Sequence, residues 1–468
     1  MHLVDYALIA VYLVGLLALG FARRLKAENS VGELIVGGRL LTLPALVASL
    51  VSTWYGGILG VGEYTYRFGI SNWLVFGLPY YLAAFLFAMF LAKKARQAEV
   101  LTIPDRLAQV YDDRVGVAGG VIIFFMTVPA AYVLMLGVLC ELLFGWSLWV
   151  GVLFGTLFSI VYVYVGGFKS VVRTDLLQFA LMFLGFIVLL VVLVAEYGGM
   201  SFLVERLPAT HFTWHGGNTA LYIAVWYFIA LATLIEPAFY QRCYAARDAA
   251  TARRGILVSI GCWAFFDFLT TSCGLYARAI LTDIPSPVGS FPALALKVLP
   301  PGLLGLFALA LLATVMSTVD SYAFLAASTF SRDIVMRQLR LDERKTTLYT
   351  RYGLVVSIGI AVILALFFRS VVDIWHVFGS IGTPALLLPV FFSFVGSRRL
   401  SPRAALVSII SSGALALVWY ISKYLTANAA YWLGIEPIFP GLVVSLVIFA
   451  FFSRREIKPL PSGRETLY

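Results

Sequence analysis

The chain has 468 residues, of which 61% are hydrophobic and only 12% are charged. Soluble globular proteins carry about 25% charged residues, so this composition excludes an ordinary soluble protein and indicates a polytopic membrane protein. The net charge of +10 does not indicate a nucleic-acid partner, because the basic residues gather in short loops between apolar segments.

Apolar segments recur along the whole chain. A helix needs about 20 apolar residues to cross the hydrocarbon layer of a membrane. We therefore predict an all-α protein with about thirteen transmembrane helices, at residues 4–22, 42–66, 71–93, 115–143, 146–165, 172–195, 220–242, 253–280, 300–330, 350–368, 373–396, 402–424 and 437–452.

The distribution of Lys and Arg predicts which ends of these helices face the cytosol, where basic loops are retained. Six of the 34 basic residues fall at even-numbered connections or outer helix ends, namely Arg67, Arg206, Arg278, Lys297, Arg369 and Lys423. The others fall on the opposite side. We expect a multi-pass protein of the plasma membrane, of the prokaryotic cytoplasmic type, with its N-terminus outside and its C-terminus in the cytosol. The lipid bilayer is its expected environment, and no obligatory protein partner is implied.

Two predicted spans are interrupted near their middles. Gly56 and Gly57 interrupt the second span, and Pro237 interrupts the seventh. Gly lowers the cost of leaving a helix, and Pro removes a backbone donor. Because the two spans lie five apart, five-helix units that begin with them would enter the membrane from opposite faces. Paired broken helices in such an inverted repeat indicate the binding site of a transporter, although close packing at glycine and a simple proline kink remain an alternative.

This pattern divides the chain into four parts. The first transmembrane helix and a cytosolic loop take residues 1–41. The first five-helix repeat takes residues 42–196, and the second takes residues 197–396. Two extra transmembrane helices and a short cytosolic tail take residues 397–468.

The ninth span carries hydroxyl groups in a run that is otherwise apolar. Thr314, Ser317, Thr318 and Ser321 stand at i, i+3, i+4 and i+7, which is one helical face, and Asp320 flanks it. Hard cations prefer several oxygen ligands, so this face predicts a cation site completed by the broken second span. Alternatively, such hydroxyls bond back to their own helix.

Four stretches resemble the sodium/solute symporter family: "ASLVSTWYGG", "GGFKSVVRTDLLQ", "PAFYQRCYAARDAATARRG" and "LLATVMSTVDSYAFLAASTFSRDI". The resemblance covers spans 1 to 11 and implies an inverted five-plus-five repeat core with broken helices, as in amino-acid and sugar symporters. It implies a sodium ion held by the hydroxyls of Ser317 and Thr318 and by the carbonyls of Thr314, Ser52 and Tyr55. Some members bind a second sodium, which here would use Asp175, Ser317, Asp320 and Ser321. Sodium would be transported, and no prosthetic group is implied.

The resemblance says less about the solute. Leu59 stands where sugar-carrying members use an amide, whereas "STWYGG" is similar to a stretch of choline-carrying members. Trp54 would then face the solute, and Glu236 nearby would pair with a cationic amine through charge and an aromatic face. Alternatively, Trp54 is ordinary packing and Glu236 faces a vestibule. The residues expected to bind solute are Trp54, Gly56, Leu59, Glu236 and Trp226.

We therefore predict a sodium-coupled symporter that carries a small organic solute into the cell by alternating access. An enzyme is not expected, because the acidic residues within the spans are dispersed. A proton-coupled symporter that uses Asp320, Asp175 or Asp267 is the main alternative, and a channel is a weaker one.

Overall fold

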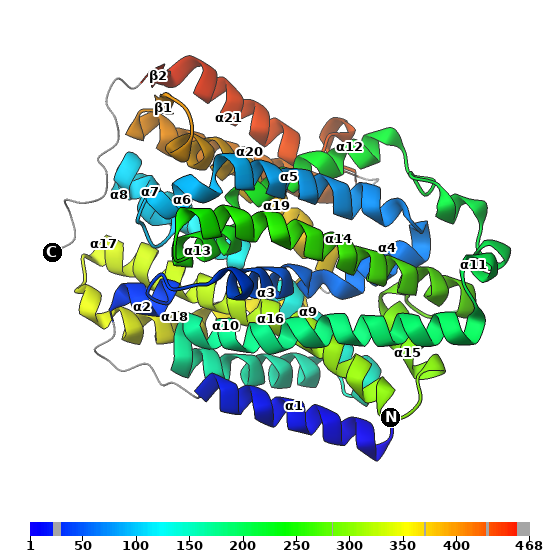
Figure 1. The fold of residues 1–468 in the computed structure, drawn as a ribbon. Helices are drawn as coiled ribbons and strands as arrows, with labels where there is room; N and C mark the ends of the chain where they lie inside the picture. The colour runs from blue at the N-terminus through cyan, green and yellow to red at the C-terminus, as the bar shows by residue number, and fades with distance from the viewer. Residues whose placement is uncertain (22–29, 283, 369–370, 427–429, 456–468) are drawn as a thin grey trace.

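The structure, a computed structural model, describes residues 1–21, 30–282, 284–368, 371–426 and 430–455. Most of these residues form helices that run roughly along one common direction (Figure 1). The N-terminus and the end of the described chain lie at opposite ends of these helices. Parts of the predicted first loop, residues 22–29, and of the predicted tail, residues 456–468, lie outside the described residues.

The first half of the chain contains twelve helical elements up to the end of the predicted first repeat. They are α1 (Leu3–Phe21), α2 (Val31–Val36), α3 (Leu43–Trp54), η1 (Tyr55–Gly57), α4 (Ile58–Phe68), η2 (Trp73–Gly77), α5 (Leu78–Phe90), α6 (Ala92–Gln97), α7 (Ile103–Val110), α8 (Asp113–Thr127), α9 (Ala130–Phe144) and α10 (Leu148–Tyr197).

The rest of the chain is also mostly helical, and its two strands, β1 and β2, pair antiparallel in a small sheet. Its elements are α11 (Met200–Arg206), η3 (Ala209–Phe212), α12 (Ala220–Ile229), η4 (Ala230–Ile235), α13 (Pro237–Ala245), α14 (Ala249–Ile280), η5 (Pro287–Gly289), α15 (Ser290–Val298), α16 (Leu303–Ser328), η6 (Thr329–Met336), α17 (Arg337–Leu339), η7 (Glu343–Lys345), α18 (Thr346–Phe368), α19 (Val371–Phe394), β1 (Arg398–Leu400), α20 (Pro402–Ile421), η8 (Ser422–Tyr424), η9 (Trp432–Gly434), α21 (Ile438–Phe452) and β2 (Ser453–Arg455).

The predicted number of thirteen transmembrane helices is not confirmed, because eleven helical segments among the described residues are long and apolar enough to cross a membrane. Two predicted spans fall within α10, whose 50 residues are interrupted by non-helical backbone at Gly167 (φ 57°, ψ −152°). A straight helix of that length would measure about 75 Å, far more than a bilayer, so α10 is two helices joined by a kink. The last predicted span is α21, which has only 15 residues.

The two predicted interruptions are confirmed. A 3-10 turn, η1, separates α3 from α4 at Tyr55–Gly57. In the seventh span α12 gives way to η4, the backbone becomes extended at Glu236 (φ −67°, ψ 114°), and α13 begins at Pro237. Both breaks expose backbone groups that a continuous α-helix would satisfy internally.

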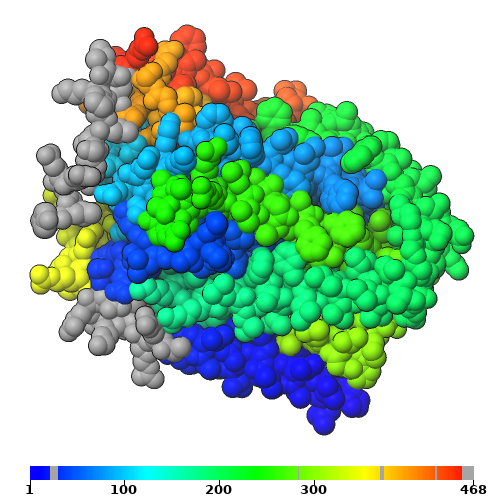
Figure 2. Space-filling view, viewed as in Figure 1, coloured from blue at the N-terminus to red at the C-terminus, as the bar shows by residue number. Residues whose placement is uncertain are grey.

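Helix α16 occupies the centre of the molecule. In its apolar stretch, 89% of the residues are buried inside the protein. The helix contacts α10, α9, α18, α1, α3 and η1. Its polar residues therefore have no route to lipid. On the face shown in Figure 2, α3 lies beside α13 and α14.

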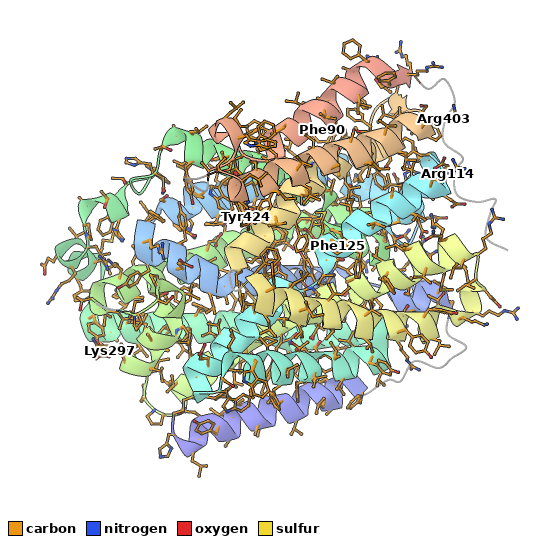
Figure 3. All side chains as sticks on the ribbon, turned by 180° about the vertical axis from the view of Figure 1, so that it is seen from behind. Phe90, Arg114, Phe125, Lys297, Arg403 and Tyr424 are labelled. Atoms are coloured by element: carbon orange, nitrogen blue, oxygen red, sulfur yellow. The ribbon has the colours of Figure 1, made fainter. Side chains whose placement is uncertain are left out.

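Charged residues on the other side of the molecule gather at the two ends of the helices (Figure 3). Arg114 and Arg403 lie toward one end, whereas Lys297 lies toward the other. This separation agrees with the predicted sidedness, in which Arg114 and Arg403 face the cytosol. The orientation of the termini stays a prediction.

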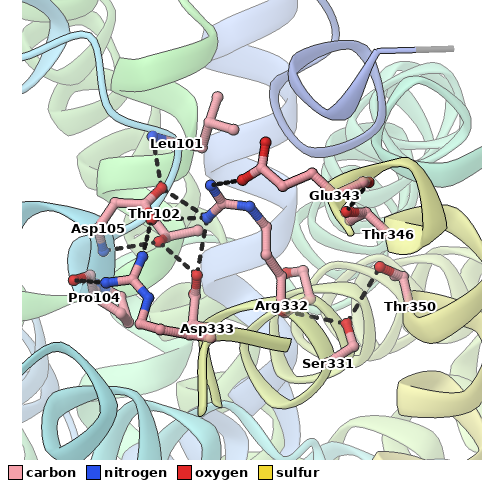
Figure 4. A network of polar contacts seen from close by, with 12 residues as sticks. Leu101, Thr102, Pro104, Asp105, Ser331, Arg332, Asp333, Glu343, Thr346 and Thr350 are labelled. Carbon is pink, nitrogen blue, oxygen red and sulfur yellow. Dashed lines mark hydrogen bonds and ion pairs between the residues drawn. The ribbon is translucent and has the colours of Figure 1, made fainter. Parts of the chain in front are cut away.

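An ion-pair cluster joins α7 to the end of the α16–η6 segment (Figure 4). Arg332 Nη1 lies 2.7 Å from Asp105 Oδ2 and 3.0 Å from Asp333 Oδ1, and Arg337 also donates to Asp105. Burial alone would raise the pKa of Asp105, yet the guanidiniums of Arg332 and Arg337 outweigh it and hold that pKa below its usual value. The ionised Asp105 therefore contributes fully to stability above about pH 3.9, the ordinary Asp value, and this contribution is lost as pH falls through the lowered pKa of Asp105.

We expect Asp105→Asn to destabilise the protein by about 3–5 kcal/mol, because it removes the carboxylate that pairs with both largely buried guanidiniums, Arg332 and Arg337. Glu343→Gln is the matched control, since Glu343 also contacts Arg332, at 3.5 Å, but is 66% exposed. The control should change stability by about 1 kcal/mol or less. Thermal unfolding of the purified variants measures both, and equal midpoints would contradict a structural role for the cluster.

Candidate functional site

The predicted hydroxyl face of α16 is buried at the centre of the protein. Thr314, Ser317, Thr318 and Ser321 are each at most 1% exposed. Thr314 Oγ1 donates back to Ala310 O at 2.7 Å, so this hydroxyl hydrogen-bonds within its own helix. Thr318 Oγ1 instead lies 2.8 Å from the carbonyl of Thr53, across the gap to α3, and 3.3 Å from that of Thr314.

Helix α16 and the break of the second span approach each other closely. A Cβ atom placed on Gly56 would lie 2.5 Å from both Cβ and Oγ1 of Thr318, closer than real atoms permit. Ser52 donates its hydroxyl back to Ala48 O at 2.9 Å, so its side chain hydrogen-bonds within its own helix. The residues predicted to hold the main sodium therefore lie on two segments that are in contact.

The carboxylate of Asp175 hydrogen-bonds with Ser317, one of the residues at this junction. Ser317 Oγ donates to Asp175 Oδ1 at 2.7 Å, and Ser49 Oγ donates to Asp175 Oδ2 at 2.5 Å. All three side chains are fully buried. Asp175 thus adds negative charge beside the oxygens of α16, which favours a cation there.

The charged partner of Asp175 was not among the predicted site residues. It is Arg242 of α13, whose Nη2 lies 3.7 Å from Asp175 Oδ2 with no part of the side chain exposed. The available signal was a lone arginine five residues after Pro237 in a predicted span. A buried charge needs a partner, but the sequence does not show which acid supplies it.

Two further acids of the spans, Asp320 and Asp267, hydrogen-bond with tyrosines outside this group. Tyr162 of α10 donates a hydrogen bond to Asp320 Oδ2, and Asp320 Oδ1 has no hydrogen-bond partner among the described residues. Tyr81 of α5 donates to Asp267, which is 5% exposed. The structure therefore does not bring Asp320 onto the same partners as Asp175 and Ser321.

Trp54 and Glu236, predicted to bind solute, each lie at one of the two helix breaks. The half-buried ring of Trp54 packs edge-on against Tyr80 and Phe239, with centroids 5.7 and 5.2 Å apart. Glu236 caps the first turn of α13 and accepts a hydrogen bond of 2.9 Å from Tyr322. These contacts surround the carboxylate and the indole with aromatic side chains.

The other three predicted solute residues have different surroundings. Trp226 of α12 packs against Phe76, at 4.5 Å between ring centroids. Leu59 is 1% exposed, and Gly56 faces Thr318. None of the described contacts joins these three to Trp54 or Glu236, so their role in solute binding stays a prediction.

Two cavities flank the site without containing it. One, of about 260 Å³, has an almost wholly apolar lining from α1, α9, α10 and α16. The other, of about 20 Å³, lies between α13 and the segments α7 and α16 and has Pro237 and Gln241 in its wall. The second has room for about one water molecule.

The profile of the family described as "SSF: Sodium:solute symporter family" matches residues 34–411. The chain belongs to the sodium:solute symporter family. Among similar proteins, the sodium/pantothenate symporter of Escherichia coli (strain K12) is 26% identical, with 92% of each chain aligned. The sodium/proline symporter of the same organism is 24% identical, over 95% of this chain and 92% of that protein. This membership establishes sodium-coupled symport of a small solute, as the sequence predicted.

Solved structures show the same fold. A Na+-coupled sialic acid symporter in a substrate-bound outward-open state superposes with a TM-score of 0.80 at 16% identity, over 97% of this symporter and 99% of that chain. Mhp1, a nucleobase-cation-symport-1 family transporter, gives 0.52 at 12% identity over 89% and 93%. The predicted architecture of paired broken helices is thereby confirmed, apart from the exact helix count.

Proposed function

We propose that this symporter imports its solute across a bacterial plasma membrane and binds sodium where α16 meets the break of the second span. The ligands would be the hydroxyls of Ser317 and Thr318 and the carbonyls of Thr314, Ser52 and Tyr55. The observation that carries this assignment is the 2.8 Å contact between Thr318 Oγ1 and Thr53 O. This contact supports the proposal because it joins a hydroxyl of α16 to backbone beside the break of the second span.

Such a site couples ion binding to alternating access. Sodium would join α16 to η1 and stabilise the arrangement in which these segments touch. If the solute binds best to the same arrangement, sodium increases the affinity for solute, and solute increases the affinity for sodium by the same factor. Release to the cytosol would separate α13 from α7 and α16, between which the structure leaves a cavity of about 20 Å³. Each sodium that enters also gains about 2.3 kcal/mol per 100 mV of membrane potential.

Transport in proteoliposomes tests the coupling ion. An inward sodium gradient at equal pH should drive solute uptake, whereas a pH gradient in potassium salts should not. The alternative is proton coupling, which is favoured by the unpartnered Oδ1 of Asp320 and by the placement of Asp267 against Tyr81. Uptake driven by the pH gradient alone would support that alternative and contradict the sodium assignment.

The solute site that we infer is acidic and aromatic. Glu236 already caps the N-terminus of α13, the end of a half-helix that would otherwise attract an anionic group. Arg242, the basic side chain nearest along α13, is held by Asp175 and hydroxyl groups. A cationic amine fits these surroundings better than a free carboxylate, since a cation gains from Glu236 and from the rings around Trp54.

We expect Glu236→Gln to weaken binding of a cationic solute by about 10–100-fold, the equivalent of one hydrogen bond to a charged group. A thermal-shift screen with quaternary amines, amino acids, carboxylates and sugars, each with and without sodium, identifies the solute class first. Glu63→Gln is the control, because Glu63 pairs with Arg67 at 2.9 Å on the surface. Sodium-dependent stabilisation by carboxylates alone would contradict the cationic assignment.

A further inference from the structure

Arg242 carries a permanent positive charge in the middle of the protein. Its side chain is fully buried, and an arginine guanidinium does not deprotonate in proteins. Nη2 donates to Ser321 Oγ at 2.7 Å and to Thr53 Oγ1 at 2.9 Å, while Nε donates to Ser49 Oγ at 3.2 Å. Three hydroxyl groups on α3 and α16 thus surround this cation.

The carboxylate of Asp175 accepts hydrogen bonds from the same group of residues. Its Oδ1 accepts from Ser317 and its Oδ2 from Ser49, and Arg242 Nη2 lies 3.7 Å from Oδ2. Arg242 Nη1 donates to Gln241 Oε1 at 2.9 Å, and the guanidinium lies 5.5 Å from the centre of the Phe168 ring. Together these contacts fix the position of the guanidinium.

These contacts place a positive charge beside the oxygens that a second sodium would need. The sequence suggests a second site at Asp175, Ser317, Asp320 and Ser321, yet Asp175 and Ser321 contact Arg242 and Asp320 bonds with Tyr162 instead. An alkali cation at Asp175 and Ser321 would meet the guanidinium at close range, and like charges repel strongly where water is absent.

We infer that Arg242 is a built-in cation which takes the place of a second sodium, so that the transport cycle carries one sodium. The inference rests on the proposed sodium site at Thr318. It also gives Arg242 a positioning role, because the guanidinium holds Asp175, and Asp175 in turn accepts the Ser317 hydroxyl and leaves the Ser317 lone pairs for the transported ion.

Counting bound sodium tests this inference without knowledge of the solute. Purified protein is titrated with radioactive sodium in potassium chloride, and the number of ions bound per protein is measured. We expect one ion, without cooperativity. A count of two ions would overturn the role of Arg242 but not the proposed sodium site. A count of zero would contradict the proposed sodium site and this inference with it.

Variants then show whether Arg242 is the cause. Arg242→Gln removes the charge and should admit a second ion, which raises the count from one to two. Arg242→Lys keeps the charge and should bind one ion. A count of one in Arg242→Gln would overturn the inference, because the vacated oxygens would then have no affinity for sodium.

Ser321→Ala decides the matter if the arginine variants do not fold. Ser321 contacts Arg242 and Thr53 but is not a ligand of the proposed main site. The variant should therefore bind one sodium with an affinity within about threefold of the parent. A tenfold or larger loss of sodium affinity would show that Ser321 ligates a transported ion, and would overturn the inference.

Discussion

Thr318→Val should raise the sodium concentration for half-maximal uptake by about 10–100-fold. The substitution keeps the branched shape of the side chain and removes the hydroxyl that faces Thr53 O at 2.8 Å. An uncompensated loss of one ligand to a charged group costs about 1.5–3 kcal/mol, which corresponds to this change in affinity. Uptake measured over a range of sodium concentrations, with ionic strength held constant by potassium, gives the value.

Two companion variants separate ligation from packing. Thr318→Ser retains the hydroxyl and should stay within a few-fold of the parent. Ser328→Ala removes a buried hydroxyl from the same helix that donates only to Leu325 O at 3.0 Å, and it should leave the sodium dependence unchanged. A sodium dependence in Thr318→Val equal to that of the parent would contradict the proposed site.

The sequence predicted the hydroxyl face of α16 because helical periodicity alone fixes which residues share a face. A spacing of i, i+3, i+4 and i+7 placed Ser317, Thr318 and Ser321 on one side, and the structure buries that side against the break of the second span. The break was predictable for a similar local reason, since paired glycines within a span weaken the helix where they stand.

Contacts between distant segments could not be predicted in this way. Asp320 flanks the hydroxyl face by angle, but only tertiary packing decides that Tyr162 of α10 lies beside it. The pairing of Arg242 with Asp175 joins α13 to α10. The sequence around each residue does not indicate that the other is its partner. Trp226 was predicted to bind solute together with Trp54; its ring packs against Phe76, and its role in solute binding stays a prediction.

The predicted helix count of thirteen is not confirmed, and the difference arises in two places. Hydropathy predicts two spans, at residues 146–165 and 172–195, where the structure has one run of 50 helical residues with a kink between them. Gly167 makes such a kink within α10, with a backbone conformation that other residues rarely adopt. Length, likewise, leaves α21 short of a full crossing at 15 residues.

Gly56→Ala should have the largest effect on transport. The new Cβ would lie 2.5 Å from Cβ of Thr318, and a branched side chain fixed on a buried helix cannot turn away. The break and α16 must therefore separate, which moves Thr318 Oγ1 away from Thr53 O. A displacement of about 1 Å at a preorganised site costs on the order of a hundredfold, so sodium-driven uptake should fall by that factor or more.

Gly60→Ala tests whether this loss comes from the close approach or from any added methyl group in the segment. Its Cβ would lie 3.6 Å from the Trp375 ring, which is ordinary contact, and uptake should stay near the parent level. Thermal stability in potassium checks that both variants fold, and the shift on adding sodium reports the site itself. Gly56→Ala should lose that shift and Gly60→Ala should keep it, because only Gly56 lies against a proposed ligand. A sodium-induced shift retained in full by Gly56→Ala would mean that the ion binds away from the junction of α16 and η1.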